Sequence, residues 1–193
     1  MLLVAVAGMA ASIHAAEIAS ATISSTQLDP TDWQYDVTLS DIGTTDIGTF
    51  WFSWMPGKDF MGVAPSDVSS PASWTDNVTH GGASDGYAIQ WLAGAGDELT
   101  PGNSLGGFQF DSTISPAEME GDSPFYPGTP VLTSFVYSGA PFSDSGFEFV
   151  VQPAAAAAPE PDNGALAMLG AAVLALMLGL RSRFQSPVPR KWL

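Results

Sequence analysis

Apolar and polar positions alternate along much of the middle of this chain. In residues 33–39 the side chains of Trp33, Tyr35, Val37 and Leu39 alternate with polar ones, so they share one face of an extended strand that is half buried. The same period of two recurs downstream, and helical periodicity is nearly absent from residues 17–152. The predicted strands are residues 18–24, 33–39, 47–54, 74–80, 87–91, 108–110, 135–137 and 147–149.

Turn-forming dipeptides separate these strands. Proline fixes φ and glycine accepts positive φ, so sequences such as those at residues 55–57 and 101–103 end strands. An Asp/Gly/Thr-rich turn between residues 33–39 and 47–54 predicts a hairpin, and the aromatic run of residues 47–54 predicts a central strand covered on both faces. This pattern predicts a single antiparallel β-sandwich, immunoglobulin-like, with a jelly roll as the alternative.

A second apolar pattern lies near the C-terminus. Residues 164–180 carry no charged or strongly polar side chain, and 17 residues of helix extend roughly 25 Å, which is the short end of a membrane span. We therefore expect a transmembrane helix, with a buried helix of a soluble core as the alternative. Four of the five Lys and Arg residues follow this run, which predicts that residues 181–193 form a cytoplasmic basic tail and that the preceding residues lie outside the cell.

The N-terminus is apolar as well. Residues 1–16 combine an apolar segment with small residues, as in a secretory signal peptide with cleavage after Ala15 or Ala16; a buried N-terminal strand is the alternative. The predicted organisation is then a signal peptide (1–16), a β-sandwich ectodomain (17–152), an Ala/Pro linker (153–163), the transmembrane helix (164–180) and the basic tail (181–193).

The C-terminal segment has three consecutive parts: Pro159-Glu160-Pro161, the apolar run 164–180, and the basic pair Arg181 and Arg183. This arrangement resembles the PEP-CTERM sorting signal of Gram-negative bacteria. The resemblance covers about 25 residues and implies an exosortase-type processing enzyme as partner, with the three residues of the Pro-Glu-Pro motif and both arginines as the processing motif. It also implies a protein of the cell membrane that is then released or attached to the surface, in the extracellular polysaccharide or biofilm matrix.

The net charge of the chain narrows the classes of partner that it can bind. The chain has 20 Asp and Glu against 5 Lys and Arg, a formal net charge of −15. Such a surface repels nucleic acid and anionic membranes, so we expect no nucleic-acid partner. The chain has no cysteine, which excludes disulfides and cysteine-based zinc sites.

Catalytic patterns are weak. His80 is the one histidine in residues 17–158, so a multi-histidine metal site is excluded there, and no nucleophile-elbow motif accompanies it. The paired acids Asp97-Glu98 and Glu118/Glu120 could in principle serve glycoside hydrolysis, but adjacent acids in Gly/Pro-rich loops are typically just exposed. We therefore predict no catalytic residue and no enzyme.

Two binding hypotheses remain. Calcium takes several oxygen ligands, which the acidic loops around residues 41–46, 76–85 and 111–122 offer, although no spaced metal motif is present and no metal ligand is assigned. Trp54 and Trp74 could stack on sugar rings if they are exposed, whereas strand aromatics more often fill the core. The leading prediction is thus a non-enzymatic secreted or surface-displayed protein, and the alternative is a carbohydrate- or calcium-binding extracellular module.

Overall fold

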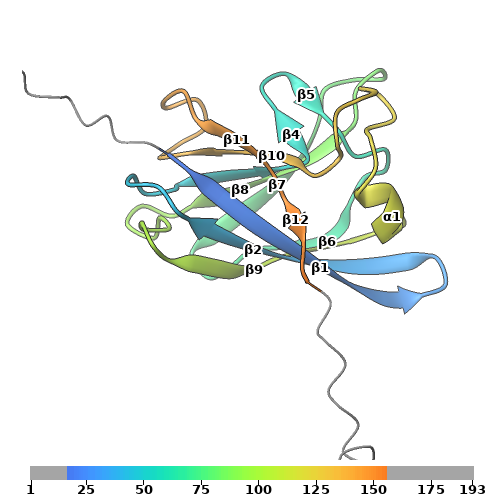
Figure 1. Ribbon diagram of the computed structural model, residues 1–193, viewed down its shortest axis with the longest axis horizontal. Coiled ribbons are helices and arrows are strands. Elements are labelled where there is room, and N and C mark those ends of the chain that lie inside the picture. Colours follow the sequence, from blue (N-terminus) through green and yellow to red (C-terminus); the bar gives the residue numbers. More distant parts are fainter. Residues whose placement is uncertain (1–16, 156–193) are drawn as a thin grey trace, which may run out of the picture. The chain divides into compact units, whose positions relative to one another are not determined.

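The computed structural model describes residues 17–155. These residues consist largely of β-strands, and the one helix among them is the single turn α1 (Pro116–Met119). The predicted all-β class is therefore confirmed for this part of the chain. Most strands form two five-stranded sheets, and Figure 1 labels all of their strands except β3.

The first sheet has the strand order β12-β1-β2-β9-β6. Its pairs are antiparallel, except that β12 runs parallel to β1. Long alternating segments can pair over many residues, and β1 and β2 accordingly pair from Ala19↔Asp41 to Asp29↔Asp32. The strands of this sheet are β1 (Ala19–Asp29), β2 (Asp32–Asp41), β6 (Ser66–Ser69), β9 (Ser104–Ser112) and β12 (Gln152–Pro153).

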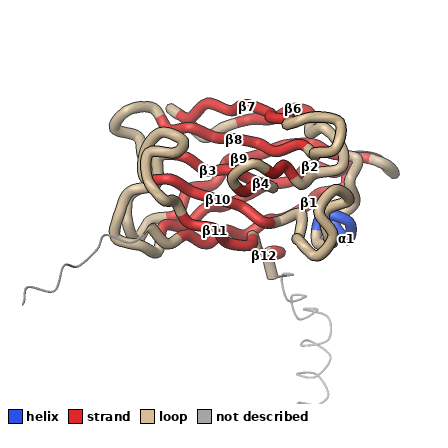
Figure 2. The backbone as a smooth tube through the Cα atoms, turned by 90° about the horizontal axis from the view of Figure 1, so that it is seen from above, coloured by secondary structure: helices blue, strands red, loops and turns tan. Residues whose placement is uncertain are grey.

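The second sheet is antiparallel throughout and has the order β11-β10-β3-β8-β7. Figure 2 shows these five strands side by side in that order. The predicted central position of the aromatic run is confirmed, because β3 is the middle strand and all four of its residues are buried. The strands are β3 (Thr49–Phe52), β7 (Trp74–His80), β8 (Tyr87–Ala93), β10 (Thr133–Tyr137) and β11 (Phe147–Val150).

One hydrophobic core joins the two sheets. The inward residues of the first sheet include Tyr35, Val37 and Leu39, each no more than 1% exposed, as their alternation predicts. They belong to the same buried cluster as Phe50 and Trp91 of the second sheet. The rings of Phe50 and Trp91 stack with centroids 5.4 Å apart. The sheets therefore form two layers around a shared apolar interior.

Two local predictions were wrong. Residues 33–39 and 47–54 do not form a hairpin, because β2 belongs to the first sheet and β3 to the second. Residues 47–54 are also not one strand, since Ser53 adopts φ of 59° and interrupts the extended backbone. Beyond this break β4 (Trp54–Met55) pairs with β5 (Lys58–Asp59) in a small hairpin of its own.

The folded unit continues past Gln152. Residues Gln152 and Pro153 pair with β1, and the amide of Ala154 donates a 2.7 Å hydrogen bond to the carbonyl of Ile23. The predicted signal peptide, the processing motif (Pro159, Glu160, Pro161, Arg181 and Arg183) and the predicted transmembrane helix lie outside the described residues. Within residues 17–155, none of the helical segments has the length and apolar character of a membrane span.

Candidate ligand-binding site

The outer face of the second sheet carries an aromatic cluster. Because side chains alternate along β3, Phe50 and Phe52 enter the core while Trp51 points to the opposite face. The turn at Ser53 folds the β4–β5 hairpin so that Trp54 stacks on Trp51, with ring centroids 4.3 Å apart. Phe135 and Tyr137 of β10 complete this second buried cluster together with Ala88.

An open pocket of about 430 Å³ borders this cluster. We call it the aromatic pocket. Phe142 stands at its edge, 66% exposed, with its ring 5.9 Å from that of Trp54. Phe142 also has a φ of 64°, a left-handed conformation that is unusual for a non-glycine residue. The residues lining the aromatic pocket are Trp51, Trp54, Gly57, Asp59, Thr79, His80, Gly81, Asp85 and Phe142.

Asp85 organises the acidic side of the aromatic pocket. Its Oδ1 accepts three hydrogen bonds, from the amide of Asp59 at 2.9 Å, the amide of Gly86 at 3.1 Å and the hydroxyl of Tyr126 at 3.0 Å. These bonds fix the turn between β7 and β8 against β5. A side chain at Gly81 would collide with Asp85 Oδ2, so glycine is required for this close approach.

Asp59 is the buried acid of the aromatic pocket. It is 5% exposed, and this burial raises the pKa of its carboxyl above the ordinary value. The negative charge of Asp85 acts in the same direction, whereas the Thr79 hydroxyl, the Gly81 amide and the His80 ring act in the opposite one. The lining of the aromatic pocket therefore combines two carboxylates, which we call the acidic wall, with aromatic side chains.

His80 lies at the end of β7 and is exposed. Its ring stacks on Tyr87 with centroids 4.4 Å apart, and its Nδ1 lies 2.7 Å from the carbonyl oxygen of Gly86. Because a carbonyl only accepts, this contact assigns the proton to Nδ1. The lining of the aromatic pocket includes no serine, so the structure does not bring a Ser/His/Asp arrangement together there.

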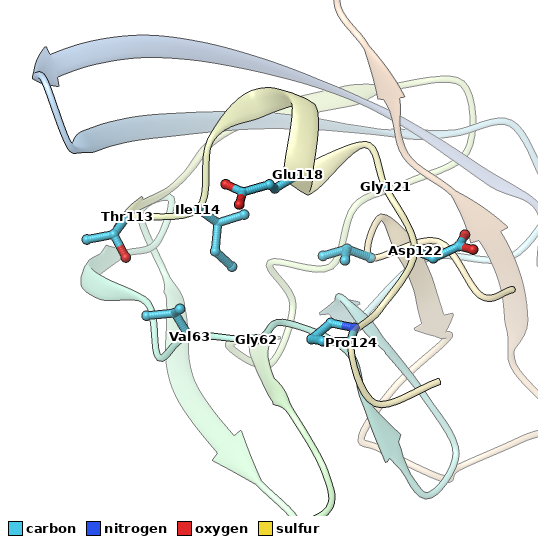
Figure 3. A pocket seen from close by; sticks show the side chains of 9 residues that line it. Gly62, Val63, Thr113, Ile114, Glu118, Gly121, Asp122 and Pro124 are labelled. Carbon is cyan, nitrogen blue, oxygen red and sulfur yellow. The ribbon is translucent and has the colours of Figure 1, made fainter. Parts of the chain in front are cut away.

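A second pocket of about 430 Å³ lies beside α1 (Figure 3). Val63, Ile114 and Pro124 give it an apolar lining. Its acids have local partners: Glu118 Oε2 accepts hydrogen bonds from the amide and hydroxyl of Ser115 and closes the capping box of α1. Asp122 Oδ2 accepts one from the amide of Gly128. The α1 pocket therefore presents few polar groups that are free to recognise a ligand.

The two predicted stacking residues, Trp54 and Trp74, lie in different parts of the structure. Trp54 is 5% exposed but lines the aromatic pocket. Trp74 is 6% exposed and lies in the shared core, where its indole N–H donates to the carbonyl of Asp97 and its ring packs edge-on against Phe108. A face of Trp74 is therefore not available to a sugar ring.

Acids of the loops considered for calcium accept local hydrogen bonds. Asp41 is 1% exposed and accepts a 2.9 Å hydrogen bond from the amide of Gly43. Asp76 accepts a 2.6 Å hydrogen bond from the hydroxyl of Ser70, whereas Asp85 belongs to the aromatic pocket. Within residues 17–155, no group of three or more His, Cys, Asp or Glu side chains is arranged to hold a metal ion.

Comparisons with known proteins give a limited result. Neither a family model nor a curated protein matches the chain. Among solved structures, the chain is similar to a family 20 exo-β-N-acetylglucosaminidase from Vibrio harveyi in complex with N-acetylglucosamine, with 11% identity, 74% of this chain covered and a TM-score of 0.39. It spans 19% of the length of that enzyme.

A chitin-binding domain from Streptomyces coelicolor is also similar, with 17% identity over 72% of this chain and 97% of that domain, and a TM-score of 0.32.

Sequence reasoning did not single out Asp59, Asp85 or Phe142 as a group. Asp85 appeared only among the acids of a calcium loop, and Asp59 lies 26 residues away from it in the chain. The available signal was the Gly-rich turn at residues 81–86, where an acid among glycines predicts a tight, hydrogen-bonded loop.

Proposed function

We propose that residues 17–155 form a carbohydrate-binding domain and that the aromatic pocket is its ligand site. The observation that supports this is the convergence of aromatic rings, carboxylates and an imidazole on one open pocket of about 430 Å³. Sugar rings present apolar faces and hydroxyl edges, so they need aromatic side chains and hydrogen-bonding groups in the same place. Phe142 supplies an exposed ring, and Asp59, His80 and Asp85 supply the polar groups.

The domain would act by binding rather than by chemistry. Asp85 Oδ1 is already engaged by three donors that hold the turn, which favours a structural role for this carboxylate over that of a nucleophile. A binding domain needs shape and hydrogen bonding but no reactive group, and this fits the lining of the aromatic pocket.

The rest of the chain supplies the delivery route in this proposal. The N-terminal segment would direct secretion, and the Pro159-Glu160-Pro161 motif, the apolar run 164–180 and the Arg181/Arg183 pair would present the protein to an exosortase-type enzyme. A protein processed in this way would lie at the cell surface or outside the cell, where extracellular polysaccharide is the available ligand.

An oligosaccharide array probed with the full-length protein tests the proposal. Retained glycans are then titrated against the wild type, Phe142→Ala and Val63→Ala. Loss of the exposed ring should weaken binding about five- to tenfold, as expected for one aromatic stacking contact. Val63 lines the α1 pocket and is 43% exposed, so its truncation should leave affinity unchanged. Absence of binding to every glycan, or equal losses in both variants, would contradict the proposal.

A further inference from the structure

The lining of the aromatic pocket contains the acids Asp59 and Asp85 but neither Lys nor Arg, and His80 is its one basic side chain. Lys58 is the one Lys or Arg in residues 17–155, and its Nζ lies 5.0 Å from the centre of the Tyr126 ring. Asp59 remains 95% buried beside the second carboxylate of Asp85. The hydrogen bonds of Thr79 and Gly81 offset the burial of Asp59 only in part, because the pKa of its carboxyl stays above the ordinary value. A ligand that brings positive charge to the two acids is therefore favoured.

The aromatic part of the lining determines what kind of cation fits. Trp51, Trp54 and Phe142 are carbon-rich and offer no oxygen ligands. A hard metal ion needs six or more oxygens around it, whereas an ammonium group is attracted both to carboxylates and to aromatic rings. The lining therefore matches an organic cation better than a metal ion.

From this geometry we propose that the aromatic pocket selects saccharides that bear a protonated primary amine, that is, amino sugars whose nitrogen is not acylated. The ammonium group would lie against Asp59 and Asp85, and the sugar ring would contact Phe142. This inference rests on the carbohydrate-binding role proposed above and names its ligand class.

The local backbone keeps the two carboxylates in place for this role. Asp85 Oδ1 is occupied by its three donors, and Oδ2 packs against Gly81 in the space that a Cβ would take. The amide of Asp59 bonds to Asp85, so the two acids are coupled through backbone as well as charge. The acidic wall thus exists before any ligand arrives.

Calorimetric titration with two matched ligands tests the inference. The probes are a glucosamine tetramer and the corresponding N-acetylglucosamine tetramer, which differ in the charge and acylation of the nitrogen. We expect the full-length protein to bind the free-amine tetramer at least about tenfold more tightly, as a charged hydrogen bond to a carboxylate would give. Binding of both tetramers with equal affinity would overturn the inference while leaving the carbohydrate-binding proposal intact, whereas binding of no saccharide would remove both.

Two variants distinguish binding in the aromatic pocket from nonspecific attraction to an acidic protein. Asp59→Asn should abolish the preference for the free amine, while Asp97→Asn, which removes the same charge from an exposed loop, should retain it. Equal loss of preference in both variants would show nonspecific attraction to an acidic protein and contradict the inference. Circular dichroism checks that Asp59→Asn is folded. If it is not, Gly81→Ala serves as the second test, because the added methyl group displaces Asp85 Oδ2 and should remove the preference for the free amine. Displacement of the glucosamine tetramer by Ca²⁺ alone at micromolar concentration would also overturn the inference.

Discussion

At the scale of single residues, Asp59 combines two unfavourable conditions. It is nearly excluded from water, and a second carboxylate lies beside it. Both conditions oppose ionisation, and the hydrogen-bonding groups around it offset them only in part. A buried acid of this kind is typical of positions where charge serves a binding function.

The raised pKa of Asp59 predicts that amine binding depends on pH. The ligand stays protonated in the acidic range, but Asp59 takes up a proton as the pH falls through its raised pKa, so the attraction is lost. The groups facing it act on the same equilibrium: Asp85 raises the pKa of Asp59, and His80 lowers it. Affinity for the glucosamine tetramer should therefore fall as the medium is acidified. Calorimetry in buffers of constant ionic strength measures this, and Asp59→Asn should bind weakly with a flatter profile.

Glu17 predicts a separate effect of pH on stability. Burial and the adjacent carboxyl of Asp144 raise the pKa of Glu17 to about 7, against 4.5 in the unfolded chain. Folding therefore favours proton uptake, and this stabilisation is complete below pH 4.5 and lost as the pH rises through about 7. Asp144 behaves oppositely, because the hydroxyl and amide of Ser138 lower the pKa of its carboxyl despite burial, and its contribution is lost only in more acidic solution.

Thermal unfolding between about pH 5 and pH 8 tests this linkage. The midpoint of the wild type should decline over this range, and Glu17→Gln should remove the part of the decline that Glu17 causes. Glu148→Gln removes an exposed acid from β11 and should keep the wild-type profile. A Glu17→Gln variant with an unchanged pH profile would contradict the assignment.

At the scale of elements, Ser53 decides where the aromatic pocket forms. Its positive φ ends β3 and directs Trp54 back onto the outer face, where it stacks on Trp51. The sequence has neither Gly nor Pro at this position, so an aromatic run that continues through it predicts one unbroken strand. Tertiary packing of the two tryptophans overrides that local preference.

This strain makes Ser53→Gly a stabilising substitution. A left-handed conformation costs an L residue roughly 1–2 kcal/mol, and the buried Ser53 hydroxyl has no hydrogen-bond partner. Glycine removes both penalties and loses about 0.5–1 kcal/mol of backbone entropy, so the free energy of unfolding should rise by about 1 kcal/mol in urea titrations. Ser53→Ala removes only the hydroxyl and should be less stable than Ser53→Gly. The reverse order would show that the strain is not released there.

The short helix α1 is a case in which a local sequence signal corresponds to the structure. Residues 115–118 read Ser-Pro-Ala-Glu, and both reciprocal bonds of a capping box are present with proline in the first turn. This signature is visible in the sequence, but no helix is predicted there because helical periodicity is nearly absent. Capping patterns predict a single turn even where no amphipathic segment follows.

At the scale of the whole molecule, alternation predicts strands better than it predicts their partners. Residues 33–39 were correctly identified as a strand with Tyr35, Val37 and Leu39 inside, but the hairpin with residues 47–54 was wrong. Period-two patterning specifies which face is buried and not which sheet a strand joins. The aromatic pocket was unpredictable for the same reason, since β3, the β4–β5 hairpin and two distant loops meet there only in the fold. The immunoglobulin-like and jelly-roll strand orders both stay predictions.

The parallel pairing of β12 with β1 leads to a final prediction about processing. Among the described residues, the last hydrogen bond to β1 runs from the amide of Ala154 to the carbonyl of Ile23. A cut near Pro159 would therefore leave both sheets complete. In a host that carries an exosortase, intact-mass analysis should find a released form with termini near residues 16 and 159 and the unfolding midpoint of the uncut chain. Replacing Pro159, Glu160 and Pro161 by alanine should block release, whereas alanine at Pro187 and Pro189 should not. A membrane-bound form that retains Leu193 as its only product would contradict the sorting proposal and leave the aromatic pocket unaffected.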